Sequence, residues 1–178
     1  MTAVTGGVTG RVFWFTGLSG AGKTTLGRMF YERLRADRAA AVFLDGDILR
    51  EVFGNDLGHS REERLRSAMR NARLCKMLAD QGIDVVCATI SLFRECQDWN
   101  RRNIPEYLEI YLRVPMEVLA KRDPKQLYSR AARGQIRDVV GVDVAADEPL
   151  APEVTVDNDG SRSPAEIAAS LYEKLAGR

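Results

Sequence analysis

Cysteine and histidine, the residues of disulfide frameworks and zinc sites, are scarce in this sequence. The 178 residues include three cysteines and a single histidine. An odd number of cysteines with no C-x-x-C pair is not the pattern of either kind of site. Cys75 falls on a predicted helix and Cys87 in a predicted buried strand. We expect these two residues and Cys96 to be small, reduced core residues in a reducing cytoplasm.

Long hydrophobic runs and an excess of one charge are also absent. No apolar stretch reaches the length that spans a membrane, and the first ten residues, MTAVTGGVTG, lack the charged and apolar regions of a signal peptide. The formal net charge is +1, which gives no field that would attract nucleic acid or an anionic membrane. We therefore expect a cytoplasmic protein with one domain over residues 11–178, preceded by a disordered lead-in over residues 1–10.

Short β-prone runs alternate with stretches of helical periodicity along the chain. This alternation predicts an α/β fold in which helices cover both faces of a parallel five-stranded sheet. Ligands of such folds bind at the carboxyl ends of the strands. Ser163 and Pro164 form a good start for the last helix. The strands are expected at 11–16, 41–44, 83–89, 107–114 and 153–156, and the helices at about 23–36, 61–80, 94–102, 116–122 and 164–176.

Residues 17–24, GLSGAGKT, match the motif G-x-x-x-x-G-K-[ST] in full. The motif follows a predicted strand and opens a predicted helix, the context in which it forms the phosphate cradle of P-loop proteins. The glycines let backbone N–H groups turn toward an anion, and the helix start adds unpaired donors. Lys23 is predicted to reach the β- and γ-phosphates of ATP or GTP, and the Thr24 hydroxyl to bind Mg²⁺. The residues expected to bind the phosphates are Gly17, Ser19, Gly20, Ala21, Gly22, Lys23, Thr24 and Thr25.

Two carboxylates, Asp45 and Asp47, end the second predicted strand, and Arg50 follows them. Beside a P-loop, such carboxylates have two natural uses. One is to hold Mg²⁺, and the other is to accept the proton of an attacking hydroxyl. A purely structural aspartate turn is the alternative reading.

Residues 123–150 have no clear periodicity and carry Arg130, Arg133 and Arg137. A long, charged, weakly patterned segment inside a compact domain is usually a functional lid or a disordered loop. Because this segment follows a predicted triphosphate site, we interpret it as a mobile lid that closes over the phosphates.

Several further motifs accompany the P-loop. They are Leu44-Asp45-Gly46-Asp47 with Arg50, Asp56-Leu57-Gly58-His59-Ser60, Arg64, Ile90-Ser91 with Arg94, and Arg122-Asp123-Pro124-Lys125-Gln126-Leu127-Tyr128. Over about residues 11–157 the chain thereby resembles the adenylylsulfate (APS) kinase family. The resemblance implies an enzyme that moves the γ-phosphoryl group of ATP, with Mg²⁺, onto the ribose 3′-hydroxyl of APS. It also suggests a homodimer.

The resemblance further implies roles for individual residues. Asp47 matches the candidate base and metal-associated carboxylate, so Thr24 and Asp47 are the expected metal ligands. Asp47, Lys23 and Lys125, the lysine of the lid, are the expected catalytic residues. Arg122 is placed at the ATP site. The residues expected to bind the acceptor are Asp45, Arg50, His59, Arg64, Ser67, Ile90, Ser91, Lys125 and Val139.

The departures from the family pattern cluster at the acceptor site. His59 and Val139 stand where the family has two phenylalanines that sandwich the acceptor adenine. Ser67 replaces an asparagine, Met69 replaces an arginine, and the S-P-x-R segment lacks its proline. Stacking on an aromatic ring is worth about 1–3 kcal/mol per base, so losing both rings should weaken adenine binding. The alternatives are a divergent APS kinase and a related kinase of another nucleotide, such as cytidine diphosphoramidate.

Other classes of protein fit less well. The spacing of the lid arginines argues against a nucleoside monophosphate kinase or a gluconate kinase. A GTPase would need a D-x-x-G motif at the second predicted strand followed by an N-K-x-D motif, and the sequence lacks this pair. A non-catalytic nucleotide-binding protein would not need intact Lys23, Thr24 and Asp47.

Overall fold

One parallel five-stranded sheet organises the residues that the computed structural model describes, which are 9–38 and 40–176. The strands lie in the order β2-β3-β1-β4-β5, and each neighbouring pair is parallel. All carboxyl ends therefore meet at one edge, where we expected the ligands to bind. The strands are β1 (Val12–Thr16), β2 (Ala41–Asp45), β3 (Asp84–Ala88), β4 (Tyr107–Arg113) and β5 (Val154–Asp157).

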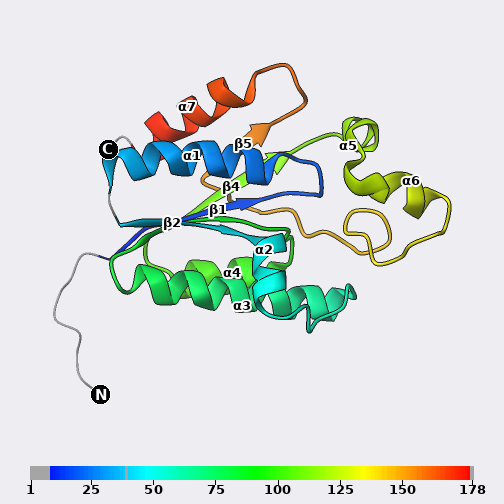
Figure 1. Cartoon of the computed structure of the whole chain (residues 1–178), viewed down its shortest axis with the longest axis horizontal. Coiled ribbons are helices and arrows are strands. Elements are labelled where there is room, and N and C mark those ends of the chain that lie inside the picture. Colours follow the sequence, from blue (N-terminus) through cyan, green and yellow to red (C-terminus); the bar gives the residue numbers. More distant parts are fainter. Residues whose placement is uncertain (1–8, 39, 177–178) are drawn as a thin grey trace.

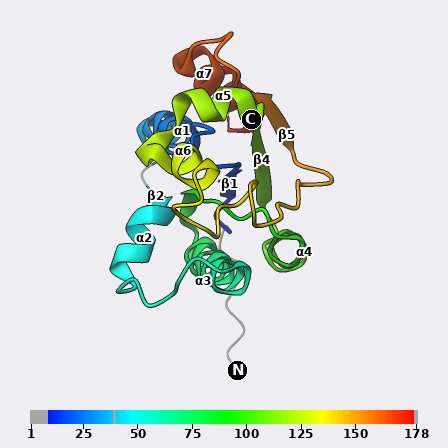
Figure 2. The same ribbon diagram turned by 90° about the vertical axis from the view of Figure 1, so that its right-hand side faces the viewer.

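Helices cover both faces of the sheet, as Figure 1 shows. Helices α1 and α7 lie on one face and α3 and α4 on the other, while α5 and α6 project beyond the carboxyl ends of the strands (Figures 1 and 2). The helices are α1 (Lys23–Asp37), α2 (Gly46–Val52), α3 (Arg61–Ala79), α4 (Arg94–Asn103), α5 (Met116–Arg122), the short 3₁₀ turn η1 (Pro124–Gln126), α6 (Leu127–Ala132) and α7 (Pro164–Leu175).

The central strand β1 divides the core into two layers, because successive side chains of a strand point to opposite faces. Phe13 and Phe15 pack with Phe30 in the layer under α1 and α7. Val12 and Trp14 belong to the layer under α3 and α4. Every residue of β1 is buried, which explains its continuous apolar sequence. This buried strand leads directly into the P-loop and fixes where it begins.

The predicted strands and helices are all present, with ends that differ by one residue at most. Ser163 caps α7 in a capping box with Glu166, as the sequence indicated. Three elements were not predicted, the short turn η1 and two helices. Helix α2 begins directly after β2, and α6 lies inside the 123–150 segment that we expected to be poorly structured.

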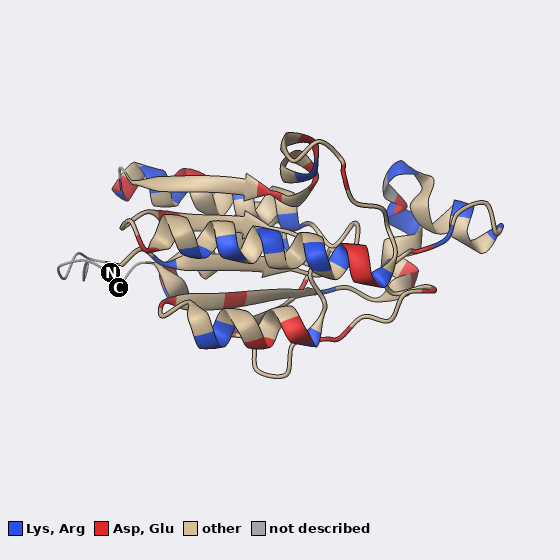
Figure 3. Ribbon diagram, turned by 90° about the horizontal axis from the view of Figure 1, so that it is seen from below, with Lys and Arg blue, Asp and Glu red and all other residues tan. Residues whose placement is uncertain are grey.

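The remaining expectations concern cysteines, the amino terminus and charge. Cys75, Cys87 and Cys96 are free, buried and part of the layer under α3 and α4, as predicted for core residues. Most of the expected lead-in, residues 1–8, lies outside the described residues, whereas Gly10 is buried and its N–H donates to the Ala79 carbonyl. Acidic and basic residues are interspersed over the helices (Figure 3). No helix among the described residues is long and apolar enough to cross a membrane.

Candidate active site

The P-loop connects β1 to α1 and wraps around the start of that helix. Gly17, Gly20 and Gly22 all have positive φ angles. Gly22 is the clearest requirement, since its φ is 94° and a Cβ would lie 2.6 Å from the Asn158 side-chain amide. The loop therefore has the backbone conformation that the motif predicted.

The Lys23 ammonium lies over the P-loop, where Nζ donates to the Leu18 carbonyl at 2.7 Å. Burial lowers the pKa of Lys23 to about 8, although the negative charges of Asp47 and Asp45 act in the opposite direction. A desolvated ammonium with only a carbonyl partner is ready to exchange that partner for a phosphate oxygen.

Asp45 joins the P-loop to α2. Its Oδ2 accepts a 2.6 Å hydrogen bond from the Thr24 hydroxyl. Its Oδ1 accepts from the backbone N–H groups of Asp47, at 2.9 Å, and Ile48, at 3.4 Å, and so caps α2. Asp45, which we had assigned to acceptor binding, thus contacts the P-loop threonine, and the alternative structural reading of this turn applies to it in part.

Asp47 is exposed, whereas Asp45 is buried. The Asp47 side chain is 82% exposed, and its Oδ2 lies 3.4 Å from the Nζ atom of Lys125, itself 84% exposed. Because both side chains are solvated, this pair adds little to stability. What matters is where the pair lies: the Asp47 carboxylate is accessible beside the phosphate-binding loop and faces the lysine of the 123–150 segment.

The oxygen donors at this point fit a hard cation. The Thr24 hydroxyl donates to the Asp45 carboxylate, and Asp47 lies two residues after Asp45 in the chain. Within the described part of the chain, no group of three or more His, Cys, Asp or Glu residues has the arrangement of a metal site. One hydroxyl and two carboxylates suit Mg²⁺, which keeps several waters and takes one or two carboxylates together with substrate phosphates.

Arg50 and Arg64 form a cluster of positive charge on the α2–α3 side. Arg50 Nη2 donates to the carbonyls of Leu57 and Gly58, while Arg64 donates to the carbonyls of His59 and Asp138, both at 2.7 Å. Neither guanidinium forms an ion pair with a carboxylate of the described residues.

The electrostatics of this cluster favour an anion. Desolvation lowers the pKa of Arg64, and the charge of Arg50 lowers it further. The pKa of His59 is also lowered, first by desolvation and then by both guanidiniums. The charges of Asp138, Asp143 and Asp47 act in the opposite direction on Arg64, but none of them forms an ion pair with it, so a negatively charged group that binds between the guanidiniums would stabilise them.

The remaining predicted acceptor residues differ in how far they are buried. The side chain of His59 is exposed at the surface, whereas Val139 is 2% exposed and packs in the layer under α1 and α7. Ser91 is buried, and its hydroxyl accepts from the Trp14 indole N–H at 2.9 Å. Ser67 and Ile90 are half-buried. Only His59 therefore offers a ring at the two positions where the family has phenylalanines.

Two side chains of the Arg122–Tyr128 motif form hydrogen bonds to backbone carbonyls of the P-loop. The guanidinium of Arg122 donates to the Gly20 carbonyl at 3.1 Å and to the Asn158 carbonyl at 2.8 Å. The Tyr128 hydroxyl donates to the Ser19 carbonyl at 2.7 Å. Arg122 therefore contacts the P-loop, and its role in binding ATP stays a prediction.

The backbone between these two contacts is strained. Asp123, Lys125 and Gln126 have φ angles of 31°, 57° and 55°, in the left-handed region that side chains disfavour. Such residues cost on the order of 1–3 kcal/mol each and cluster at functional sites. The conformation projects Lys125 toward Asp47.

A cavity of about 550 Å³ adjoins the P-loop, and sequence reasoning did not find most of its lining. Asn158 follows β5 and donates to the Ala21 carbonyl at 2.8 Å. Its place at the carboxyl end of a strand was the available signal. The size suits a nucleotide base and sugar. The cavity is lined by Gly20, Gly22, Thr25, Leu26, Arg122, Asn158, Gly160, Ser161, Arg162, Ser163 and Pro164.

The chain is similar to known proteins over most of its length. The family model described as "Adenylylsulphate kinase" matches residues 9–157. A cytidine diphosphoramidate kinase of Campylobacter jejuni is 39% identical over 165 residues, covering 93% of this chain and 96% of that protein. A probable adenylyl-sulfate kinase of Archaeoglobus fulgidus is 40% identical over 148 residues, covering 83% and 96%.

One solved structure superposes on nearly the whole of this chain. The APS kinase of Mycobacterium tuberculosis, in complex with AMPPNP and APS, superposes with a TM-score of 0.84 at 31% identity, covering 94% of this chain and 98% of that one. The chain therefore belongs to the adenylylsulfate kinase family of P-loop kinases, phosphotransferases that use an alcohol group as acceptor.

Proposed function

We propose that this protein transfers the γ-phosphoryl group of ATP to the ribose 3′-hydroxyl of a nucleotide that carries an anionic 5′ group. The observation that carries the proposal is the position of Asp47. Its exposed carboxylate meets Lys125 at 3.4 Å, and its charge acts on both Lys23 and Arg64. One carboxylate thus influences both the phosphate-binding lysine and Arg64 of the arginine cluster.

The donor side of the reaction is built from the P-loop. Backbone N–H groups and Lys23 bind the phosphates, and Arg122 closes the side of the base cavity. Mg²⁺, when bound with ATP, would be held by Thr24 and the adjacent aspartates and would neutralise charge on the transferring group.

Asp47 is the proposed base. As the 3′-oxygen attacks the γ-phosphorus, its O–H bond breaks and the proton passes to the Asp47 carboxylate. A new oxygen–phosphorus bond forms while the bond to the β–γ bridging oxygen breaks, which releases ADP. Lys125 stabilises the negative charge on the transferring group, because phosphoryl transfer depends on positioning and charge neutralisation.

Arg50 and Arg64 bind the anionic 5′ group of the acceptor. Both are planar, fork-shaped donors, and each exchanges a carbonyl partner for the ligand. Adenylyl sulfate is the first candidate acceptor, since the P-loop, lid and arginine motifs all resemble those of APS kinases.

Cytidine diphosphoramidate is the second candidate, and one observation favours it. Val139 has no aromatic ring and is buried, so of the two positions only His59 offers a ring on which a base can stack. A pyrimidine has less surface to stack than adenine and loses less from a missing ring. The similar kinase from Campylobacter jejuni carries that substrate in its name.

The test is an ADP-release assay on the purified protein with ATP and Mg²⁺ and three kinds of acceptor: adenylyl sulfate, cytidine diphosphoramidate and nucleoside monophosphates. We expect turnover with one of the first two and none with the monophosphates. The Lys23→Ala variant is the control for contaminating kinases. Turnover that persists in this variant, or that needs no acceptor, would contradict the proposal.

Two further parts of the proposal concern the whole protein. We propose a cytoplasmic homodimer in which residues 123–150 form a mobile lid. Light scattering of the purified protein tests the dimer, and hydrogen exchange with and without ATP analogue tests the lid.

A further inference from the structure

Three polar side chains form a row along one face of α4. Arg94, Gln97 and Arg101 are three and four residues apart, so they lie on the same side of the helix. All three donate hydrogen bonds to one extended stretch of chain, residues 147–151, which we call the return limb because it leads from the lid segment back to β5.

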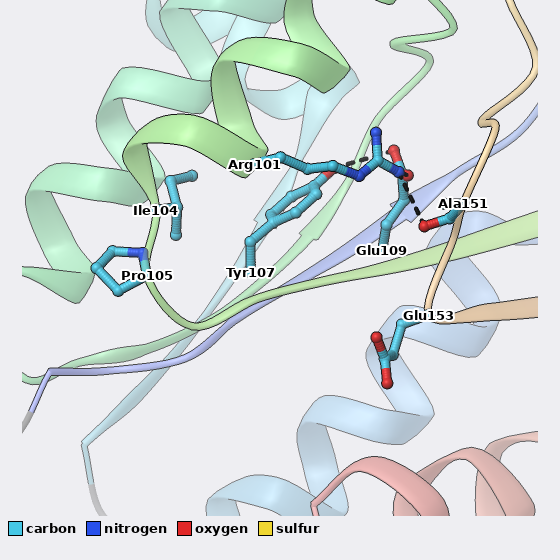
Figure 4. Close-up of a pocket in the computed structure, with 7 residues that line it drawn as sticks. All are labelled: Arg101, Ile104, Pro105, Tyr107, Glu109, Ala151 and Glu153. Carbon is cyan, nitrogen blue, oxygen red and sulfur yellow. Dashed lines mark hydrogen bonds and ion pairs between the residues drawn. The ribbon is translucent and has the colours of Figure 1, made fainter.

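The hydrogen bonds from this row to the return limb all go to backbone carbonyls. Arg94 Nη2 donates to the Glu148 carbonyl at 2.9 Å, Gln97 Nε2 donates to the Asp147 carbonyl at 2.7 Å, and Arg101 Nη2 donates to the Ala151 carbonyl at 3.1 Å. Figure 4 shows the Arg101 side chain reaching across to Ala151.

The row is itself held in place. The second Arg94 nitrogen, Nη1, donates to the Gln97 side-chain oxygen at 2.8 Å, and Gln97 is 1% exposed. At the other end, Arg101 pairs with the buried Glu109, to which the Tyr107 hydroxyl also donates (Figure 4). Gln97 and Glu109 are buried, whereas Arg94 is half-buried and Arg101 is exposed, so two buried partners anchor the row and limit its alternative arrangements.

The return limb also forms hydrogen bonds at the start of α4. The backbone N–H of Arg94 donates to the Asp147 carboxylate at 3.0 Å, and the Asp147 N–H donates to the Leu92 carbonyl at 2.9 Å. Leu92 follows Ile90 and Ser91, the predicted backbone contacts of the acceptor. The limb is thus fixed to the segment that carries part of the proposed acceptor site.

Just before the limb, residues 138–144 form a compact turn. The Asp143 carboxylate accepts from the N–H groups of Asp138 and Val139 at 2.8 and 2.6 Å. The Asp138 carbonyl accepts from Arg64, one of the two proposed acceptor-binding arginines. A displacement of the limb would therefore be transmitted through the turn to Arg64.

We propose that Arg94, supported by Gln97 and Arg101, is a positioning residue for the acceptor: it fixes the return limb so that the 138–144 turn meets Arg64. This inference rests on the proposed function, because it assigns the affected ligand to the acceptor site. ATP binding is independent of the row, since the cavity beside the P-loop contains no residue of α4 or of the limb.

The experiment compares Arg94→Ala with Arg102→Ala. Arg102 is an exposed arginine of the same helix whose side chain, among the described residues, hydrogen-bonds only to the Asp98 carbonyl of that helix. We expect the Arg94 variant to raise KM for the acceptor about tenfold, the effect of losing charge-assisted hydrogen bonds. Its KM for ATP, its kcat at saturating acceptor and all constants of the Arg102 variant should stay within about twofold of wild type.

The Arg94→Lys variant separates positioning from folding. Its ammonium keeps one donor for the limb, so it should recover part of the lost acceptor affinity at an unchanged melting temperature. If the alanine variant unfolds at the assay temperature, the lysine variant carries the comparison and should show a smaller shift in the same direction. Unchanged acceptor KM in both variants, or an equal rise in both substrates' KM, would overturn the inference.

A tryptic digest keeps this inference distinguishable from the proposed function. The lid segment carries exposed arginines at 130, 133 and 137, and cleavage there should be several-fold faster in Arg94→Ala than in Arg102→Ala, because a released limb opens more often. If the wild-type protein phosphorylates no acceptor, the proposed function fails while faster cleavage still supports the fixed limb. Equal cleavage rates in the two variants would overturn the limb's role.

Discussion

Titration of Lys23 should make ATP binding depend on pH in one defined window. Burial lowers the pKa of this ammonium to about 8 in the free protein. Bound phosphates place negative charge beside it and raise its pKa again. Below pH 8 the lysine is protonated in both states, so affinity is constant. Above pH 8 the free lysine is neutral and binding must take up a proton, so affinity falls as pH rises.

The size of the effect follows from the pKa. With a free-state pKa of about 8, roughly nine-tenths of Lys23 is protonated at pH 7 and about one-tenth at pH 9, so the affinity should fall about tenfold between them. The assay is calorimetric titration with a non-hydrolysable ATP analogue at saturating Mg²⁺ and without acceptor. Repeating it at pH 9 in buffers of different ionisation enthalpy counts the proton taken up.

The Lys23→Arg variant is the control, because a guanidinium stays charged throughout this range. Its affinity is expected to be lower than that of wild type but independent of pH. Equal wild-type affinity at pH 7 and pH 9, with no proton uptake, would refute the reasoning, since it would mean that Lys23 is not desolvated as the structure places it.

Three further predictions concern the acceptor side and the lid. Asp47→Asn should lower kcat about 10²- to 10⁴-fold while the analogue's Kd changes less than about threefold; an equal loss of affinity would make Asp47 mainly a metal-site residue. His59→Phe should lower KM for adenylyl sulfate about tenfold through stronger stacking, and an unchanged KM would count against stacking at this position. Gly141→Ala should cost about 1–3 kcal/mol in urea unfolding, because φ is 86° and a Cβ would lie 2.8 Å from Leu18 Cδ2. Gly134→Ala is its matched control, with positive φ but no atom within 4 Å, and an equal loss in both would exclude the Leu18 contact.

The sheet and the P-loop were predictable because their signals are local. A buried strand such as β1 reads as a continuous apolar run, and the glycines that follow it have few other uses. Helix α2 was missed for a physical reason. Asp45-Gly46-Asp47 has the composition of a turn, and only the capping hydrogen bonds of the Asp45 carboxylate convert it into a helix start.

The lid segment shows the limit of the same reasoning. Its charged composition predicted weak structure, yet Val139, Val140 and Val144 are buried. The Asp143 hydrogen bonds that shape this turn are local, but the segment is also held by Gln97 of α4, which lies about 50 residues away in the sequence and is not visible in the local pattern. The role of Asp45 at Thr24 depends likewise on two strand ends meeting at one edge. Resemblance placed Val139 at an acceptor position but did not reveal its burial.

The central claim is that the γ-phosphoryl group of ATP reaches a ribose 3′-hydroxyl of a nucleotide acceptor. Phosphorus NMR of the products, formed with whichever acceptor is turned over in the ADP-release assay, tests it most directly. The account predicts one new phosphomonoester, coupled to the ribose H3′ of the acceptor, formed in equal amount to ADP. Inorganic phosphate released in place of that product, or a phosphoryl group on another atom of the acceptor, would contradict it.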